Sequence, residues 1–167
     1  DRPMRPLFPE GFIDEVQMQA WVMSHDGQND ADVIACCGAS AAPHITDAPF
    51  EGPVATVRVA RIYTDDGSQF VLNPSQSQME FSDLDLVLSG HKDGINMIEV
   101  GAAEITEEDM MEAMKFGLEE GIKPILELME ELRDKCDAPE KRLGDLTLPS
   151  DEVFNTVKDA IYDELVE

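Results

Sequence analysis

The sequence lacks long hydrophobic runs and has few cysteines. Its uninterrupted apolar stretches are only a few residues long, far below the roughly 20 residues that a helix needs to cross a bilayer, so we expect no membrane span. The three cysteines, Cys36, Cys37 and Cys136, are odd in number and have no framework spacing. This pattern argues against a disulfide-stabilised secreted protein and favours a reducing compartment, so we expect a cytoplasmic protein.

Recognisable metal-ligand motifs are also missing. No Cys-x-x-Cys pair is followed by histidines at zinc spacing. His25, His44 and His91 lie far apart in loop-like contexts, which favours ordinary surface or loop histidines over metal ligands or catalytic bases. We therefore predict no metal-binding residue from these side chains.

Basic residues are scarce. The chain has 12 Lys and Arg against 36 Asp and Glu, a formal net charge of −24. Because a groove that holds nucleic-acid phosphates needs clustered Lys and Arg, this balance excludes broad electrostatic binding of RNA by this chain alone. The acidic residues are best interpreted as a solvated helix surface that keeps the protein soluble.

The chain has 167 residues, of which 43% are apolar, so it is long enough for one domain with a core.

The stretch from Asp83 to Ala102 predicts a β-hairpin around which the rest is organised. Its first half alternates, with leucines on one face and Asp83, Asp85 and Val87 on the other. Asp93-Gly94 is a strong hairpin turn, and a second apolar run follows it. The alternating face thus carries two carboxylates two residues apart, and an active site is expected here if the chain has one.

The N-terminal segment contains two of the few basic residues. Pro3, Pro6 and Pro9 oppose a regular helix, so we expect an extended segment. Arg2 and Arg5 are three residues apart, which places them on one side of a polyproline-like stretch. They could form a phosphate or RNA clamp, but spacing alone favours ordinary surface arginines.

The remaining pattern predicts alternating strands and helices. Asn29 or Asp30 is a plausible N-cap for a buried helix that packs closely through Gly38 and ends at Pro43. A long helix begins with a capping box at Thr106 and is interrupted near Gly121 and Pro124. The other expected elements are strands at 16–23, 53–63 and 69–72, a turn at 64–68, a loop at 75–82, a linker at 137–150 and a helix at 151–166.

Several motifs in one order then resemble the polynucleotide phosphorylase family. They are RPMRPLFPEGF at 2–12, GASAA at 38–42, FEGP at 50–53, FVLNP at 70–74, SDLDLV at 82–87 and SG at 89–90. The resemblance covers residues 1–136 and is to the first of that family's two ribonuclease-PH-like domains. It implies an α+β, ribonuclease-PH-like (ribosomal protein S5 domain 2-like) mixed sheet packed with helices. A linker at 137–150 and the first helix of an all-α domain at 151–167 would follow, so the chain resembles a fragment.

The resemblance also implies a function. The family degrades RNA from its 3′ end with inorganic phosphate and releases nucleoside diphosphates. It uses Mg²⁺, works as a homotrimer in the cytoplasm, and can join RNA-degradation complexes. Catalysis belongs to its second ribonuclease-PH-like copy.

This chain departs from the active pattern at the positions that carry the chemistry. Asp85 matches one family aspartate, but the family lysine is replaced by Val87 and the second aspartate by Met79. The phosphate-binding serines correspond to Asp30, Ala31 and Asp32, and two carboxylates there repel phosphate. The resemblance therefore implies no catalytic and no metal-binding residue, and neither Mg²⁺ nor inorganic phosphate is expected to bind this chain as a cofactor.

Arg2 matches an arginine that lines the vestigial site in the family, and Arg5 lies beside it. These two are the candidate phosphate- or RNA-binding residues. Two functions stay open: a structural and RNA-path domain of a phosphorolytic ribonuclease, or a free-standing acidic interaction module with the same fold. An autonomous exonuclease conflicts with Val87, Met79 and the acidic pair at 30 and 32.

Overall fold

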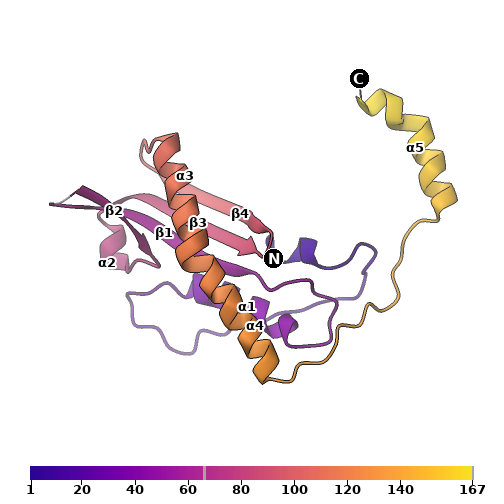
Figure 1. Cartoon of the computed structure of the whole chain (residues 1–167), viewed down its shortest axis with the longest axis horizontal. Helices are drawn as coiled ribbons and strands as arrows, with labels where there is room; N and C mark the ends of the chain where they lie inside the picture. Colours follow the sequence, from indigo (N-terminus) through magenta and orange to yellow (C-terminus); the bar gives the residue numbers. More distant parts are fainter. Residues whose placement is uncertain (66, 167) are drawn as a thin grey trace.

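The computed structural model describes residues 1–65 and 67–166, and in them one four-stranded sheet is covered by helices (Figure 1). All neighbouring strands pair antiparallel, so the α+β class is confirmed, whereas the parallel pairing implied by a mixed sheet is not found among the described strands. The strands, in the order β2-β1-β3-β4 across the sheet, are Gly67–Leu72, Ala55–Thr64, Ser82–His91 and Gly94–Ala102.

The predicted hairpin is β3 and β4. Leu84, Leu86 and Leu88 are 0–1% exposed, as the alternating pattern predicts, and they form the centre of the main core. Between β1 and β3 the register shifts: two steps along β1, from Ala60 to Ile62, match three along β3. β3 therefore holds one extra residue, a β-bulge, next to Asp83.

Helices lie on both faces of the sheet. On one face, α1 (Ala31–His44) approaches the strands, where the Cys37 thiol contacts the backbone of Thr56. On the other face a continuous helical segment crosses the sheet as α3 (Glu107–Phe116), a π-helical turn η2 (Gly117–Ile122) and α4 (Lys123–Lys135) (Figure 1). The interruption predicted near Gly121 is thus confirmed as a widened turn, and the Thr106 hydroxyl caps α3 as expected.

The glycines of the two helical layers have different surroundings, and this gives a paired prediction. A methyl group on Gly117 would lie 2.7 Å from Leu88 Cδ1 and 2.9 Å from Val59 Cγ2, whereas one on Gly38 meets nothing within 4 Å. We expect Gly117→Ala to lower the free energy of unfolding by about 1–3 kcal/mol through overpacking. Gly38→Ala should raise it by about 0.5–1 kcal/mol, because alanine favours the helix. Urea unfolding of both variants measures this, and equal effects would contradict it.

Several local predictions were wrong. His44 and His91 are not surface or loop residues, since they are 4% and 8% exposed and lie in α1 and β3. Gly38 does not mediate close packing, because it is exposed, and α1 continues through Pro43 to His44. Residues 16–23 form no strand and are all exposed, because no strand of the described residues lies beside them to satisfy their backbone groups. The expected loop at 75–82 contains the short helix α2 (Gln76–Met79), capped by Ser75. The N-terminal segment is not extended, since η1 (Arg5–Leu7) is a 3₁₀ turn. The predicted turn at 64–68 includes residue 66, outside the described residues.

The C-terminal part leaves the body of the molecule. The helix α5 (Asp151–Val166) has no buried residue and projects away from the sheet (Figure 1). The segment before it is attached to the core, since the Thr147 amide donates to the Gly11 carbonyl at 2.8 Å. No helix among the described residues is long and apolar enough to cross a membrane.

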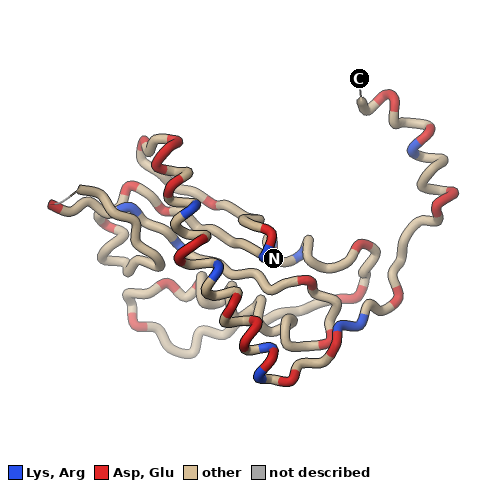
Figure 2. The backbone as a smooth tube through the Cα atoms, in the orientation of Figure 1, with Lys and Arg blue, Asp and Glu red and all other residues tan. Residues whose placement is uncertain are grey.

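Figure 2 shows the acidic residues spread along α3, α4 and α5, where most are exposed, as expected of a solvated helix surface.

Candidate functional site

The candidate site is a cluster of carboxylates around one arginine. Arg58 on β1 contacts Asp30 through Nη1, Asp32 through Nη2 at 2.8 Å, and Asp85 through Nε at 3.1 Å. The contact between Arg58 Nε and Asp85 Oδ1 is an ion pair by distance, but its alignment is not that of a hydrogen bond. Asp30 also accepts a hydrogen bond from the side-chain amide of Gln76. We call Asp30, Asp32, Arg58 and Asp85 the Arg58 cluster.

Three elements position these side chains. Asp30 is the N-cap residue of α1 and Asp32 lies in its first turn, but the Asp30 side chain makes no capping hydrogen bond and contacts Arg58 instead. Arg58 pairs in register with Val87, and Asp85 is the next residue of β3 on that face. The Arg58 side chain is 14% exposed, whereas its three carboxylates are 31–54% exposed. The arginine is therefore the least exposed member of a partly open acidic site.

The chemistry of the Arg58 cluster follows from its charges. One guanidinium faces three carboxylates, so the cluster carries a net negative charge that would repel phosphate. Its fixed cation in turn opposes a second cation among the same oxygens. No group of three or more His, Cys, Asp or Glu side chains in the described part of the chain is arranged to hold a metal ion. The geometry is that of a structural ion-pair cluster.

The structure brings together positions that the family resemblance had singled out separately. Asp85, from the expected metal position, and Asp30 and Asp32, from the expected phosphate position, converge on Arg58. Met79 lies apart from the ion pairs, half-buried at the end of α2. Sequence reasoning missed Arg58. The available signal was an arginine between the apolar residues Val57 and Val59 of a strand, since an arginine withdrawn from water needs a partner.

The two arginines predicted as phosphate or RNA ligands lie elsewhere. Arg2 forms a long ion pair with Glu99 on β4 at 3.8 Å, and Arg5 binds Asp1 at 2.9 Å. Their side chains are 72% and 77% exposed. No hydrogen bond or ion pair among the described residues joins either of them to the Arg58 cluster. Both are open to a ligand, so their assignment as phosphate or RNA contacts stays a prediction.

A second arginine on β1 organises another ion-pair network. Arg61 is 8% exposed, and it donates to Asp83 from Nε at 3.0 Å and to Asp109 on α3 from Nη1 at 2.7 Å. The Tyr63 hydroxyl also donates to Asp83, at 2.8 Å. The Arg61 guanidinium, assisted by Tyr63, lowers the pKa of the Asp83 carboxyl although burial opposes this. Arg61 therefore fastens α3 to the first residues of β3.

The lowered pKa of Asp83 predicts acid sensitivity. The ionised carboxylate is favoured in the folded state, so its contribution to stability is complete above the ordinary aspartate pKa near 4 and is lost as the pH falls through the lowered value. We expect Asp83→Asn to be less stable than the parent at neutral pH, and this difference to shrink toward pH 3. Urea titrations across this range measure it. A pH-independent difference, or an equal response from the exposed Glu152→Gln control, would contradict the assignment.

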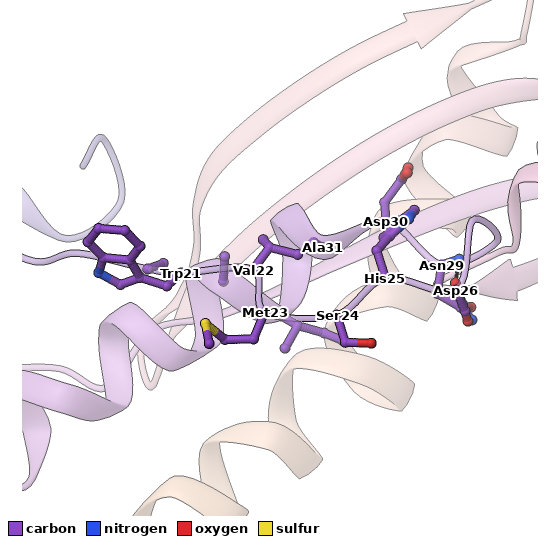
Figure 3. Close-up of a pocket in the computed structure, with 12 residues that line it drawn as sticks. Trp21, Val22, Met23, Ser24, His25, Asp26, Asn29, Asp30 and Ala31 are labelled. Carbon is purple, nitrogen blue, oxygen red and sulfur yellow. Dashed lines mark hydrogen bonds between the residues drawn. The ribbon is translucent and has the colours of Figure 1, made fainter.

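A hollow of about 650 Å³ lies beside the Arg58 cluster, between residues 20–26 and the start of α1 (Figure 3). In this view Trp21 lies at one end and Asn29 and Asp26 at the other, with Asp30 near that second end. Asp30 also lines a smaller cavity of about 130 Å³ together with Arg58. The larger hollow contains no Lys or Arg, and the pKa of its Asp26 is lowered to about 2 by hydrogen bonds from the amides of Asn29 and Gln28. Its lining is mostly apolar and includes the carboxylates of Asp26 and Asp30, which is unsuited to phosphate.

Comparisons with known proteins agree with this fold. Residues 52–120 match the 3′ exoribonuclease family, domain 2. The polyribonucleotide nucleotidyltransferase of Sulfurihydrogenibium azorense is 50% identical over 136 residues, which are 81% of this chain and 18% of that protein. The enzyme of the same name from Geotalea uraniireducens is 41% identical over all 167 residues, 23% of its own length. The chain thus spans about a fifth of these relatives.

A solved structure shows the same fold at low identity. Rrp46 of rice (Oryza sativa) superimposes with a TM-score of 0.54 and 14% sequence identity. The match covers 65% of this chain and 50% of that one. Together with the family match over residues 52–120, this likeness confirms the ribonuclease-PH-like arrangement expected from the sequence.

Proposed function

We propose that this chain is a non-catalytic core domain of a phosphorolytic 3′-to-5′ exoribonuclease, because it is 41–50% identical to polyribonucleotide nucleotidyltransferases over most of its length and residues 52–120 match domain 2 of the 3′ exoribonuclease family. The parent enzyme would degrade RNA with inorganic phosphate and release nucleoside diphosphates, using Mg²⁺. In this proposal the present domain supports assembly of a homotrimer and the path of the RNA.

The Arg58 cluster is the observation that carries the non-catalytic role. A phosphorolytic site must hold an anionic attacking group and a divalent cation close together. At the corresponding positions this chain has three carboxylates around a guanidinium that is only 14% exposed. The cation that these carboxylates bind is thus the Arg58 guanidinium and not a metal ion, and the negatively charged carboxylates would repel phosphate.

The proposed supporting role rests on surfaces that remain open. Arg2 and Arg5 are exposed and, in this proposal, contact RNA phosphates that the parent enzyme delivers to its catalytic copy. Membership of an RNA-degradation complex and a cytoplasmic location belong to the same proposal.

The decisive experiment compares the chain with the protein from its source. We expect the 167-residue chain, given RNA, phosphate and Mg²⁺, to release no nucleoside diphosphate, and the native protein to have a mass several times 18.5 kDa and to release it. A native mass equal to that of this chain, without phosphorolysis, would favour a free-standing acidic interaction module instead.

A single substitution tests the account of the site. Val87→Lys restores the family lysine beside Asp85, and we expect it to give no phosphorolysis, because Asp30 and Asp32 still repel phosphate and Arg58 still occupies the carboxylates. The assay is phosphate-dependent release of nucleoside diphosphates by the purified chain. Release by this variant would overturn the proposed reason for inactivity.

A further inference from the structure

A buried histidine lies outside the Arg58 cluster, at the last position of α1. His44 is 4% exposed, and neither ring nitrogen makes a hydrogen bond within the described residues. Its Nε2 lies 3.3 Å from Glu130 Oε2 on α4, an ion pair only if the imidazole is protonated. A buried, incompletely partnered imidazole is sensitive to protonation.

Two cations bind the backbone carbonyl of the same residue. Lys141 Nζ donates to the carbonyls of Pro43, His44 and Thr46 at 2.7, 3.0 and 2.9 Å. The Arg133 guanidinium, from α4, also donates to the His44 carbonyl. The C-terminal carbonyls of a helix have no partner within the helix and carry its negative dipole end, so these cations cap α1.

Lys141 belongs to the segment that leads to α5. We call residues 138–148 the strap. Arg133 Nη2 donates to the Pro139 carbonyl at 2.7 Å, and the Arg142 amide donates to the Asp47 carbonyl at 2.8 Å. With the bond from Thr147 to Gly11, these contacts hold the strap along the core. Lys141, which makes three of the bonds, is its central attachment.

We propose that the strap is a pH-sensitive clamp: protonation of His44 places a third positive charge beside Lys141 and Arg133 and releases the strap from the end of α1. The charged groups facing this site are Glu130 and Arg133 on α4, Lys141 on the strap, and Asp47 after α1, which acts on Lys141. Cations outnumber the single carboxylate that touches His44, so an added charge there favours the open strap.

The direction of titration agrees with this geometry. Burial chiefly lowers the pKa of His44, and Lys141 and Arg133 lower it further, while Glu130 opposes them. Burial chiefly lowers the pKa of Lys141 as well, and Arg133 lowers it further, while Asp47 opposes them. A histidine with a lowered pKa is neutral at pH 7 and stabilises the closed arrangement there. This stabilisation is lost as the pH falls below the ordinary histidine value of about 6.5.

Amide hydrogen exchange of the complete chain tests the clamp, because the amides of Arg142 and Thr147 are bonded only while the strap is closed. After correction for intrinsic rates, we expect strap peptides to exchange several-fold faster at about pH 5 than at about pH 7.5, with at most a tenfold change per pH unit for one proton. Exchange in β1 and β3 should not change. A strap equally protected at both pH values would overturn the proposal.

Matched variants assign the effect. His44→Gln stays neutral, so its strap should show no pH-dependent exchange. Lys141→Met should exchange rapidly at both pH values, whereas Lys158→Met, on exposed α5, should behave like the parent. Glu130→Gln removes the attraction for the imidazolium and should move opening to lower pH. Unaltered pH dependence in His44→Gln, or strap protection that increases on acidification because Glu130 captures the imidazolium, would contradict the clamp.

Discussion

Replacing Arg61 with methionine should lower the free energy of unfolding by about 3 kcal/mol, at the lower end of the range for breaking a buried ion pair. Arg61 is almost fully buried, and its removal leaves Asp83, 19% exposed, without its main counter-ion. The Asp109 partner on α3 loses a hydrogen bond as well. Urea unfolding at neutral pH measures the loss.

The control for this prediction keeps the positive charge at position 61 but replaces the planar guanidinium group. Arg61→Lys can contact one carboxylate but cannot donate in parallel to Asp83 while also reaching Asp109. We expect it to recover part of the stability. Arg61→Met combined with Asp83→Asn should also be more stable than Arg61→Met alone, since the side chain at position 83 then carries no charge that lacks its counter-ion. Full additivity of the two changes would show that they do not interact.

Removal of Arg58 should cost about 2 kcal/mol, less than a fully buried pair because the carboxylates around it are partly exposed. In Arg58→Met the carboxylates of Asp30, Asp32 and Asp85 face one another without a cation. Their mutual repulsion should loosen the start of α1 more than the sheet. Unfolding by urea gives the loss, and hydrogen exchange of residues 31–36 gives its location.

Salt and a second substitution identify the cause. Because the loss arises from like charges, raising the ionic strength should reduce it, and adding Asp85→Asn to Arg58→Met should recover part of the stability. Arg2→Met removes an exposed arginine paired at 3.8 Å and should change stability by less than about 0.5 kcal/mol. A loss for Arg2→Met as large as for Arg58→Met would contradict the special role of Arg58.

The sequence predicts those elements whose signals are local. The hairpin at 83–102 follows from period-two leucines and an Asp-Gly turn, and both lie within the segment itself. The interruption of the long helix follows from Gly121 and Pro124, although its form as a π-helical turn depends on packing against Val57 and Leu72. The segment 16–23 has strand-like residues, but a strand also needs a neighbour, and that requirement is not local.

The same distinction applies to the site. Asp30, Asp32 and Asp85 were identified individually by comparison with a family pattern, and their convergence was not. The residues that neighbour Arg58 in the sequence do not predict its contact with Asp30 at the start of α1, because the two residues are 28 positions apart. The strap was predicted only as a linker, since the attachment of Lys141 to α1 joins residues nearly a hundred positions apart.

The β-bulge in β3 limits what side-chain replacement can achieve in this domain. With regular alternation Asp83 and Asp85 would project together, but the extra residue directs Asp83 toward Arg61 and α3 while Asp85 faces Arg58 and α1. The backbone path of β3, and not the identity of the acidic residues, separates the two carboxylates. A protein engineer who wished to gather these two carboxylates would therefore have to shorten the strand by one residue, since exchanging side chains on the present backbone leaves them on opposite sides of the sheet.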